Sequence, residues 1–491
     1  MRSVKVAVVV LLVGVAELGN AQVRETRSEG PQTPQQVARA VTAPAPSAAA
    51  SGVDSQNPFF GGVPSGKASP EVLELSLLEA IDRSVKNNLG LLLSEQGTRA
   101  ARGKRLRALS DLLPNVTTHV SETLQQTNLA ALGFSGFPGV RQIVGPFSVF
   151  DTRAFVSQAI FDLHAIHNTR SESASVRAAE FSYRDARDIT VLVTADLYLR
   201  AIAGASRIEA ARAQVKTAEA LYRHATDLKK AGVAPGIDVL RAQVEWQARQ
   251  QRLIFFENEF AKQKLSLARA IGLPIGQQFT LTEQARYDPM PPLTLEEALD
   301  RAYHSRPDYQ GAMALVQAAE LSRKAAQGKA FPSLRFDGNY GVTGQTPGRS
   351  HGSFAAVIDL KIPIFQGGKV RGEVLEADAR IEERKAELEN FRSRIEYEVR
   401  VAFLDIKAAG DQVQVAKSAL QLANEQLKQA ENRFAAGVVN NLEVVQAQEA
   451  VATADENYIS SRYAFNIAKA MLARAMGEAE QAIRRYLGGK K

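Results

Sequence analysis

The chain carries one pattern twice, and this internal repeat limits its possible folds more than any other feature. Residues 77–83 (LLEAIDR) resemble residues 295–301 (LEEALDR), 218 positions further on. Residues 231–239 and 436–444 both begin with Ala-Gly-Val and end with an acidic residue and valine, 205 positions apart. Repeats of this size predict one pseudo-symmetric unit rather than the three domains that 491 residues would suggest.

Both repeats have the same predicted order of elements, and we expect repeat 1 at 71–280 and repeat 2 at 281–480, followed by a basic tail at 481–491. A helix (75–110 and 295–328) is followed by two strands, a very long helix, a turn with glycine and another long helix. The long stretches, 166–230 and 370–435, contain no proline and are rich in strong helix formers. Apolar residues recur in them at spacings of three and four, which predicts long antiparallel helical hairpins.

The N-terminal residues predict export from the cytoplasm. Two cations, Arg2 and Lys5, precede an apolar run at 6–16, and small residues follow it, so 1–21 has the form of a secretory signal peptide. The run is too short to span a bilayer. Seven of the nineteen prolines lie in 22–70, which we interpret as a flexible extension. In an exported chain the net charge of +7 is weak support for nucleic-acid binding, and we expect no nucleic-acid partner.

The predicted strands have one apolar and one polar face. Phe354, Ile358, Leu360 and Ile362 share one face, whereas the alternate positions carry charges such as Asp359. This pattern fits transmembrane strands whose apolar face contacts lipid; a soluble sandwich with an apolar core is the alternative. Only four such strands are predicted. Four strands cannot close a barrel, and open edges are not tolerated in lipid, so several copies must pool their strands.

These features together resemble the TolC-type outer-membrane efflux protein family. The most specific stretch is 362–369 (IPIFQGGK), with Pro363, Gly367 and Gly368 at the junction from strand to helix. The resemblance covers most of the chain. It implies a mainly helical homotrimer, in which four strands from each copy complete a twelve-stranded barrel above an α-helical tunnel. It also implies outer-membrane lipid around the barrel and two partners, a periplasmic adaptor and an inner-membrane transporter.

The resemblance implies that the turns of the helical hairpins form a periplasmic tip, where the channel closes and the adaptor binds. The positions that match this tip are Gly232, Val233, Asp238, Gly437, Val438, Glu443 and Gln446. Glu443 stands where the family often has an acid of a constricting ring, and three copies would favour cations there. Asp238 and Glu443 also follow turns, so the alternative is that they only complement helix dipoles. Gln446 replaces a second acid one turn further on.

No catalytic constellation is visible, so we expect neither an enzyme nor a cofactor. Glycine-rich phosphate loops, dinucleotide fingerprints and nucleophile elbows are absent from the sequence, as is cysteine. His164 and His167 fit an ordinary polar surface better than a metal site. We therefore expect the outer-membrane channel of a tripartite efflux or type I secretion system, with its tunnel in the periplasm. The alternative is a soluble periplasmic coiled-coil scaffold or adaptor.

Overall fold

The structure is a computed structural model that describes residues 57–133, 139, 141–233, 235–283, 287, 293–436, 438–439 and 441–486. The predicted signal peptide, most of the predicted extension, Gly437 and the end of the basic tail lie outside the described residues.

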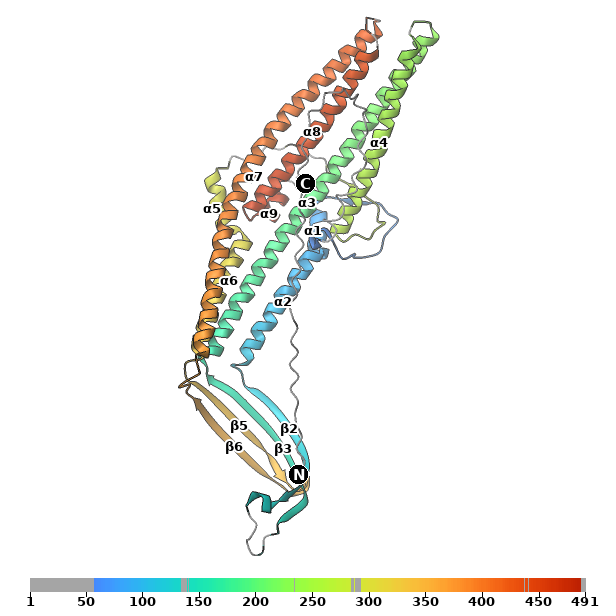
Figure 1. Ribbon diagram of the computed structural model, residues 1–491. Helices are drawn as coiled ribbons and strands as arrows, with labels where there is room; N and C mark the ends of the chain where they lie inside the picture. Colours follow the sequence, from blue (N-terminus) through green and yellow to red (C-terminus); the bar gives the residue numbers. More distant parts are fainter. Residues whose placement is uncertain are drawn as a thin grey trace, which may run out of the picture. The chain divides into compact units, whose positions relative to one another are not determined.

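The same order of elements occurs twice along the chain (Figure 1). The first half contains η1 (Pro58–Phe60), β1 (Leu73–Leu75), α1 (Leu77–Asn87), α2 (Leu89–Ser110), β2 (Asn115–Asn128), η2 (Leu129–Leu132), β3 (Ile143–Phe161), α3 (Leu163–Lys230) and α4 (Gly236–Ala270). The second half contains β4 (Phe279–Leu281), α5 (Leu295–Ser305), α6 (Pro307–Gly328), β5 (Ser333–Gly344), η3 (Pro347–Arg349), β6 (Ser350–Lys361), α7 (Lys369–Ala435), α8 (Asn441–Ala475) and α9 (Ala479–Tyr486).

The two long helices, α3 and α7, confirm the prediction of long helical stretches. They contain 68 and 67 residues, which corresponds to about 100 Å each. The Asp162 side chain caps the start of α3 by accepting a hydrogen bond from the Ala165 N–H (3.0 Å). One 18-residue window of α3 is apolar enough to cross a membrane, but 61% of it is buried inside the protein, as in a core helix.

The prediction of single helices at 75–110 and 295–328 was wrong, because each is broken into two. The breaks fall at Asn88 and Arg306, which adopt extended backbone angles. Proline disfavours helical angles in the preceding residue, so Pro307 explains the break at Arg306. At the other break the Asn88 side chain accepts a hydrogen bond from the Gly90 N–H (3.0 Å) and starts a new helix.

A glycine lies against each of these breaks. Gly272 follows α4 and Gly477 follows α8, with φ of 68° and 76°. A Cβ on Gly272 would lie 2.5 Å from the Cβ of Asn87, and a Cβ on Gly477 would lie 2.7 Å from the main-chain nitrogen of Arg306. The close approach and the left-handed angle both require glycine. The same joint between a hairpin end and a helix break is therefore built twice.

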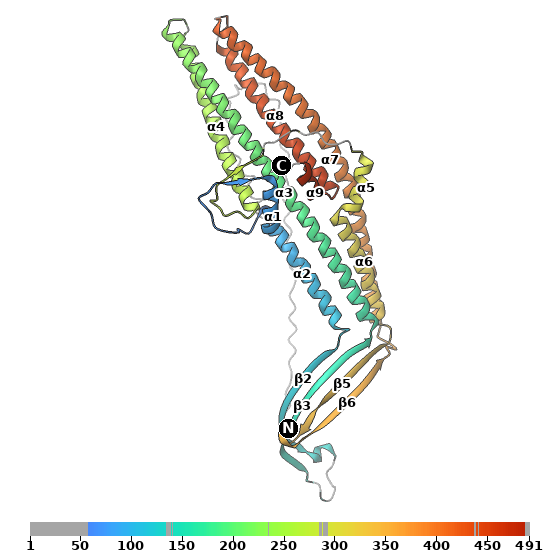
Figure 2. The same cartoon turned by 180° about the vertical axis from the view of Figure 1, so that it is seen from behind.

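The four predicted strands form one antiparallel sheet in the order β2-β3-β5-β6. They continue from the ends of α2, α3, α6 and α7, at the opposite end of these helices from the hairpin turns (Figures 1 and 2). A second, parallel pair of strands, β1 with β4, was not predicted from the sequence. Each of its strands has three residues, too few for a visible alternation of side chains.

The strand register aligns the two predicted faces across the sheet. Residues opposite each other in an antiparallel pair share a face. Ile358 pairs with Phe336 and Leu360 with Leu334, whereas the charged Asp359 pairs with Arg335 on the other face. The apolar side chains are exposed; Phe354, for example, is 80% exposed. Ile362 lies one residue beyond the end of β6. The single chain thus carries an apolar sheet face that nothing in the described residues covers.

The largest apolar core lies where α1, α3, α4 and the β1–β4 pair meet. Fully or almost fully buried members are Leu75, Ile81, Val191, Tyr198, Leu267 and Ile271. Elsewhere α3 packs along α2, α4, α6 and α8, while α7 packs along α6 and α8. Helix α8 therefore connects its own hairpin to the hairpin of α3 and α4 (Figure 2).

Candidate functional site

The two hairpin turns have nearly the same geometry and lie at the same end of their helices (Figure 1). In the first, the Val233 N–H donates to the Leu228 carbonyl (2.9 Å); in the second, the Val438 N–H donates to the Arg433 carbonyl (3.0 Å). Gly232 has a φ of 73°, whereas Gly437 is outside the described residues. Both valine side chains are about two-thirds exposed or more, at 73% and 69%. Each turn therefore exposes an apolar side chain on its surface.

The two acids of the predicted tip are both paired within the chain. Asp238 is buried, lies in the first turn of α4 and forms an ion pair with Arg241 (3.5 Å). Glu443 lies in the first turn of α8, and its carboxylate is 2.6 Å from the Arg433 guanidinium. In the first turn of α4, the helix dipole favours a carboxylate such as that of Asp238. Glu443 remains partly exposed at 37%, while Gln446 is exposed.

An apolar cluster holds the two hairpins together near their turns. It combines residues from both hairpins, namely Leu221, Ala225, Ala242, Ala430, Val444 and Ala447. Next to it, the Asn441 side-chain amide donates to the main-chain carbonyl of Asp238 (2.7 Å). Contacts between α4 and α8 therefore join the two hairpins of one chain near their turns.

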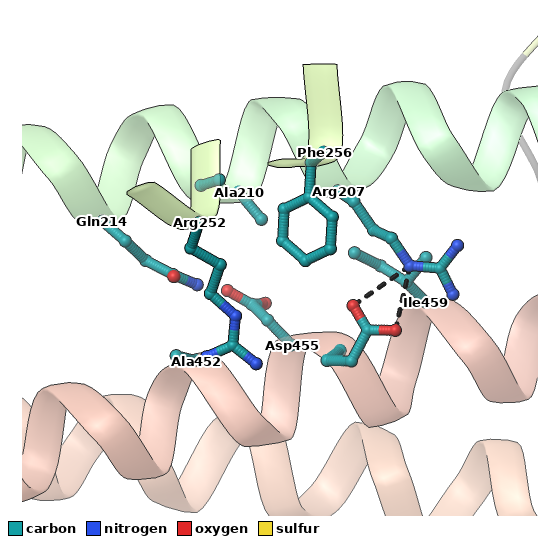
Figure 3. Close-up of a pocket in the computed structure, with 10 residues that line it drawn as sticks. Arg207, Ala210, Gln214, Arg252, Phe256, Ala452, Asp455 and Ile459 are labelled. Atoms are coloured by element: carbon teal, nitrogen blue, oxygen red, sulfur yellow. Dashed lines mark hydrogen bonds and ion pairs between the residues drawn. The ribbon is translucent and has the colours of Figure 1, made fainter. Parts of the chain in front are cut away.

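Three further polar contacts follow along α8 at seven-residue intervals, and the sequence analysis missed them. Glu449 accepts from Arg249 of α4 (2.5 Å), and Arg249 is only 4% exposed. Glu456 pairs with Arg207 of α3 (2.9 Å; Figure 3). Tyr463 donates to Asp196 of α3 (2.5 Å). The seven-residue spacing of these side chains on α8 could have indicated a shared contact face. It does not identify the partners, which lie 200 or more positions away in the sequence.

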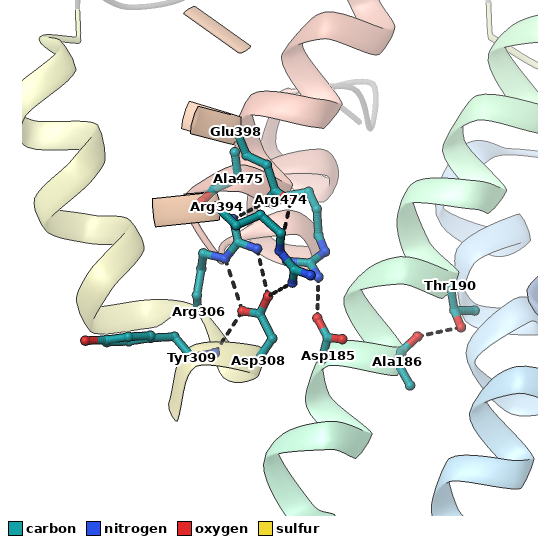
Figure 4. A network of polar contacts seen from close by, with 10 residues as sticks. All are labelled: Asp185, Ala186, Thr190, Arg306, Asp308, Tyr309, Arg394, Glu398, Arg474 and Ala475. Atoms are coloured by element: carbon teal, nitrogen blue, oxygen red, sulfur yellow. Dashed lines mark hydrogen bonds and ion pairs between the residues drawn. The ribbon is translucent and has the colours of Figure 1, made fainter. Parts of the chain in front are cut away.

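A charge network around a buried arginine ties the start of α6 to α7 and to the end of α8, further from the hairpin turns (Figure 4). Its centre is Arg306, which is 1% exposed and binds Asp308 (2.7 Å) and Glu398 of α7 (2.5 Å). Arg394 also binds Asp308 (3.2 Å). Burial raises the pKa of Asp308, but the hydrogen bonds with Arg306 and the charges of Arg306 and Arg474 together outweigh burial and lower this pKa. The network therefore keeps its carboxylate charged.

Next to this network, two carboxylates of α3 lie near a single arginine of α8. Asp185 and Asp188 both face Arg474 of α8, which forms an ion pair with Asp185 (Figure 4). Asp188 accepts a hydrogen bond from the main-chain N–H of Glu480, and the Glu480 side chain binds Arg187 (2.6 Å). Burial raises the pKa of Asp188 to about 6, and the charge of Asp185 adds to this effect.

Replacing Asp188 with asparagine should stabilise the protein above pH 6. Because the pKa of Asp188 is raised, the folded state keeps the proton on this carboxyl between about pH 4 and pH 6, whereas the unfolded state has already lost it. Stability therefore falls as pH rises from about 4 to about 6 and stays lower above that range. Asp188→Asn removes this loss and should gain about 1–3 kcal/mol at pH 7.5 but little at pH 4. Denaturant unfolding at both pH values measures it, and an equal change at both would contradict the assignment.

The strand-to-helix junction is shaped by the residues that the sequence singled out. Pro363 lies two residues beyond the end of β6, where the sheet needs no further N–H. Gly367 and Gly368 have φ of 59° and 83° and lead into the first turn of α7. Between them and the strand, Ile364 and Phe365 are 96% and 88% exposed. The exposed apolar surface of the sheet therefore continues past the end of β6 to the start of α7.

Within the described ranges, no group of three His, Cys, Asp or Glu side chains is arranged to hold a metal ion. The His164 ring is 2.9 Å from the Ala325 carbonyl, and burial with nearby Arg170 and Lys324 lowers the pKa of His167. Both rings thus belong to the contact between α3 and α6.

An apolar-faced sheet joined to helices of about 100 Å defines a class, that of outer-membrane channel subunits with a helical periplasmic part. Residues 80–273 and 298–478 match the family described as "Outer membrane efflux protein". The chain belongs to this family, whose members are channel and transport proteins, and it is an outer-membrane efflux channel.

Individual relatives are distant in sequence but span most of the chain. The "Probable efflux pump outer membrane protein TtgC" of Pseudomonas putida is 22% identical over 417 residues, covering 82% of this chain and 83% of the relative. "Alkaline protease secretion protein AprF" of Pseudomonas aeruginosa is 21% identical and covers 67% of this chain and 69% of the relative. The outer-membrane channel OprN has a similar fold, with a TM-score of 0.69 at 19% identity over 82% of this chain and 90% of that one.

Proposed function

We propose that three copies of this chain form a gated outer-membrane channel that passes solutes from an inner-membrane transporter to the exterior. The observation that carries the proposal is the open sheet with an apolar face. Strands β2 and β6 are its edges: each pairs with one strand, β3 or β5, and has no partner on its outer side in the described residues. An unpaired edge in lipid leaves main-chain groups without hydrogen bonds, so β6 of one copy must pair with β2 of the next.

Helices at the two sides of the same chain support the same ring. Exposed apolar residues follow α4 (Leu240, Val244, Ile254 and Phe255) and α7 (Tyr397, Leu404, Val415 and Leu422). The α7 set contains two pairs at seven-residue spacing, as expected of a helical seam. A contact between α7 of one copy and α4 of the next is head-to-tail, and such contacts form a ring when the rotation from one copy to the next closes. The β6–β2 pairing and the α7–α4 contact would therefore be made with the same adjacent copy.

The partners follow from the ends of this ring. The exposed Val233 and Val438 at the hairpin turns suit a helical adaptor in the periplasm. Relatives are named for an efflux pump and for alkaline protease secretion, so small solutes and proteins are both cargo classes to test. The inner-membrane transporter supplies the energy. Adaptor binding must favour the open tip by several kcal/mol to invert an equilibrium that favours the closed one.

Substitutions of the two partners in the Arg433–Glu443 ion pair should change the ion selectivity of the pore in opposite directions. Glu443→Gln leaves the Arg433 charge unpaired and should reduce cation selectivity of the reconstituted pore. Arg433→Gln leaves Glu443 unpaired and should increase cation selectivity. The measurement is the reversal potential in a salt gradient, at low ionic strength where screening is weak. If both variants keep the wild-type potential, these residues do not line the pore.

The proposal as a whole is tested by the mass of the particle extracted with detergent from an outer-membrane fraction. Light scattering should give three times the mass of one mature chain. A monomer recovered from the soluble periplasm would mean that the strands do not contact lipid, and a periplasmic scaffold would replace the channel.

A further inference from the structure

Five polar residues of α8 recur at every seventh position and form what we name the polar column. Its members are Asn441, Gln448, Asp455, Arg462 and Lys469. Asn441, Gln448 and Lys469 are 0%, 7% and 6% exposed. A seven-residue repeat keeps the members close to one face of a helix. Buried polar residues at such positions are unusual, because each loses contact with water.

The seam between α8 and α7 has the opposite character. It includes small or apolar residues of α8 such as Ala454, Phe465 and Ala468, whereas Val444 and Ala447 belong to the apolar cluster near the turns that joins both hairpins. Phe465 and Ala468 pack against Ala409 and Val413 of α7 in one buried cluster. The hairpin of α7 and α8 is therefore held together by ordinary apolar packing.

Two members of the polar column, Asn441 and Asp455, contact the other hairpin. Asn441 donates to the Asp238 carbonyl of α4, as described above. Asp455 accepts a hydrogen bond from Gln214 of α3 and lines a small cavity with Arg252 and Phe256 of α4 (Figure 3). Gln448 lies midway between Asn441 and Asp455 on the same face of α8.

Several atoms of the column have no hydrogen-bond partner among the described residues. They are Oδ1 of Asn441, Oε1 and Nε2 of Gln448, and Nε of Arg462. A buried polar atom that is left unpaired raises the free energy of the state that contains it. The column therefore weakens the packing of α8 against α3 and α4 in this arrangement, and apolar residues would pack there at a lower cost.

We propose that the polar column keeps the contact between the two hairpins weak, so that α7 and α8 can move away from α3 and α4 when the tip opens. When the hairpins separate, water reaches the amides of Asn441 and Gln448, and the penalty disappears. The column thus shifts the equilibrium towards the open tip, while Glu449, Glu456 and Tyr463 keep the closed register. This inference rests on the proposed gated channel.

Gln448→Leu tests the inference because it removes both unpaired atoms at one site. We expect the thermal midpoint of the extracted particle to rise and the open fraction in planar bilayers to fall about tenfold, which corresponds to ~1.4 kcal/mol. Gln421→Leu, which changes an exposed glutamine of α7 outside the predicted tip, is the matched control and should change neither. Gln448→Glu buries a charge and should act in the opposite direction, with a lower midpoint and a larger open fraction.

The outcomes separate this inference from the channel itself. If wild-type protein forms no pores, the proposed channel fails and the inference fails with it. If wild-type protein conducts and Gln448→Leu opens as often as wild type, or melts earlier, the channel stands and the inference is overturned. In that case the column serves only to fix the register of α8.

Discussion

Replacing both Ile358 and Leu360 with arginine is expected to abolish assembly in the outer membrane. Both side chains lie on the apolar face of β6, opposite Phe336 and Leu334 of β5. An arginine on a lipid-facing position costs about 2–4 kcal/mol near the middle of the bilayer, and two such sites exceed what an assembling barrel tolerates. The measurement is the yield of oligomer in the outer-membrane fraction.

The matched control uses the other face of the same strand. Ala355 and Val357 pair with Asn339 and Asp337 and lie on the polar face. Arginine at these two positions faces the proposed lumen, where water hydrates it, and assembly should persist. A normal oligomer yield for the Ile358 and Leu360 variant, or equal loss in both variants, would refute the assignment of the lipid-facing side.

Replacing Arg306 with alanine should lower the free energy of unfolding by about 3–5 kcal/mol, because a buried ion pair then loses one partner. The substitution leaves Asp308 and Glu398 without their main cation, and Asp308 is only 8% exposed. It also removes the hydrogen bond to the Ala475 carbonyl at the end of α8 (3.4 Å). Denaturant unfolding with a helical signal measures the change.

An exposed ion pair on α7 provides the comparison. Arg380 and Glu376 are 65% and 63% exposed and lie one helical turn apart. Arg380→Ala should change stability by less than about 0.5 kcal/mol. Similar losses for Arg306→Ala and Arg380→Ala would mean that the network in Figure 4 does not act as a buried unit.

The sequence predicted the parts of the fold that depend on local periodicity. Helices α3 and α7 begin within three residues of their predicted starts and end at their predicted ends, because helix formers continue without proline up to the turns. The break at Arg306 was readable from Pro307, and we missed it. The break at Asn88 was less visible, because it depends on a side-chain cap that competes with a continuous helix.

The candidate site was less predictable because its contacts join distant segments. Arg433 lies ten positions from Glu443, so their pairing follows once the hairpin is known. Arg249 and Glu449 lie 200 positions apart, and only the docking of α4 against α8 brings them together. Periodicity shows which side of a helix is in contact, but it does not name the partner.

The glycine joint at Gly272 and Gly477 has a consequence for the symmetry of the assembly. Each joint fixes the end of one hairpin against the break of one short helix pair, and neither tolerates a side chain. A ring of these chains contains this joint at twice as many places as it has subunits. The two joints of one chain are similar but not identical. Around the ring, the joints therefore approximate a rotational symmetry of twice the number of subunits, whereas the exact symmetry is that of the subunits alone.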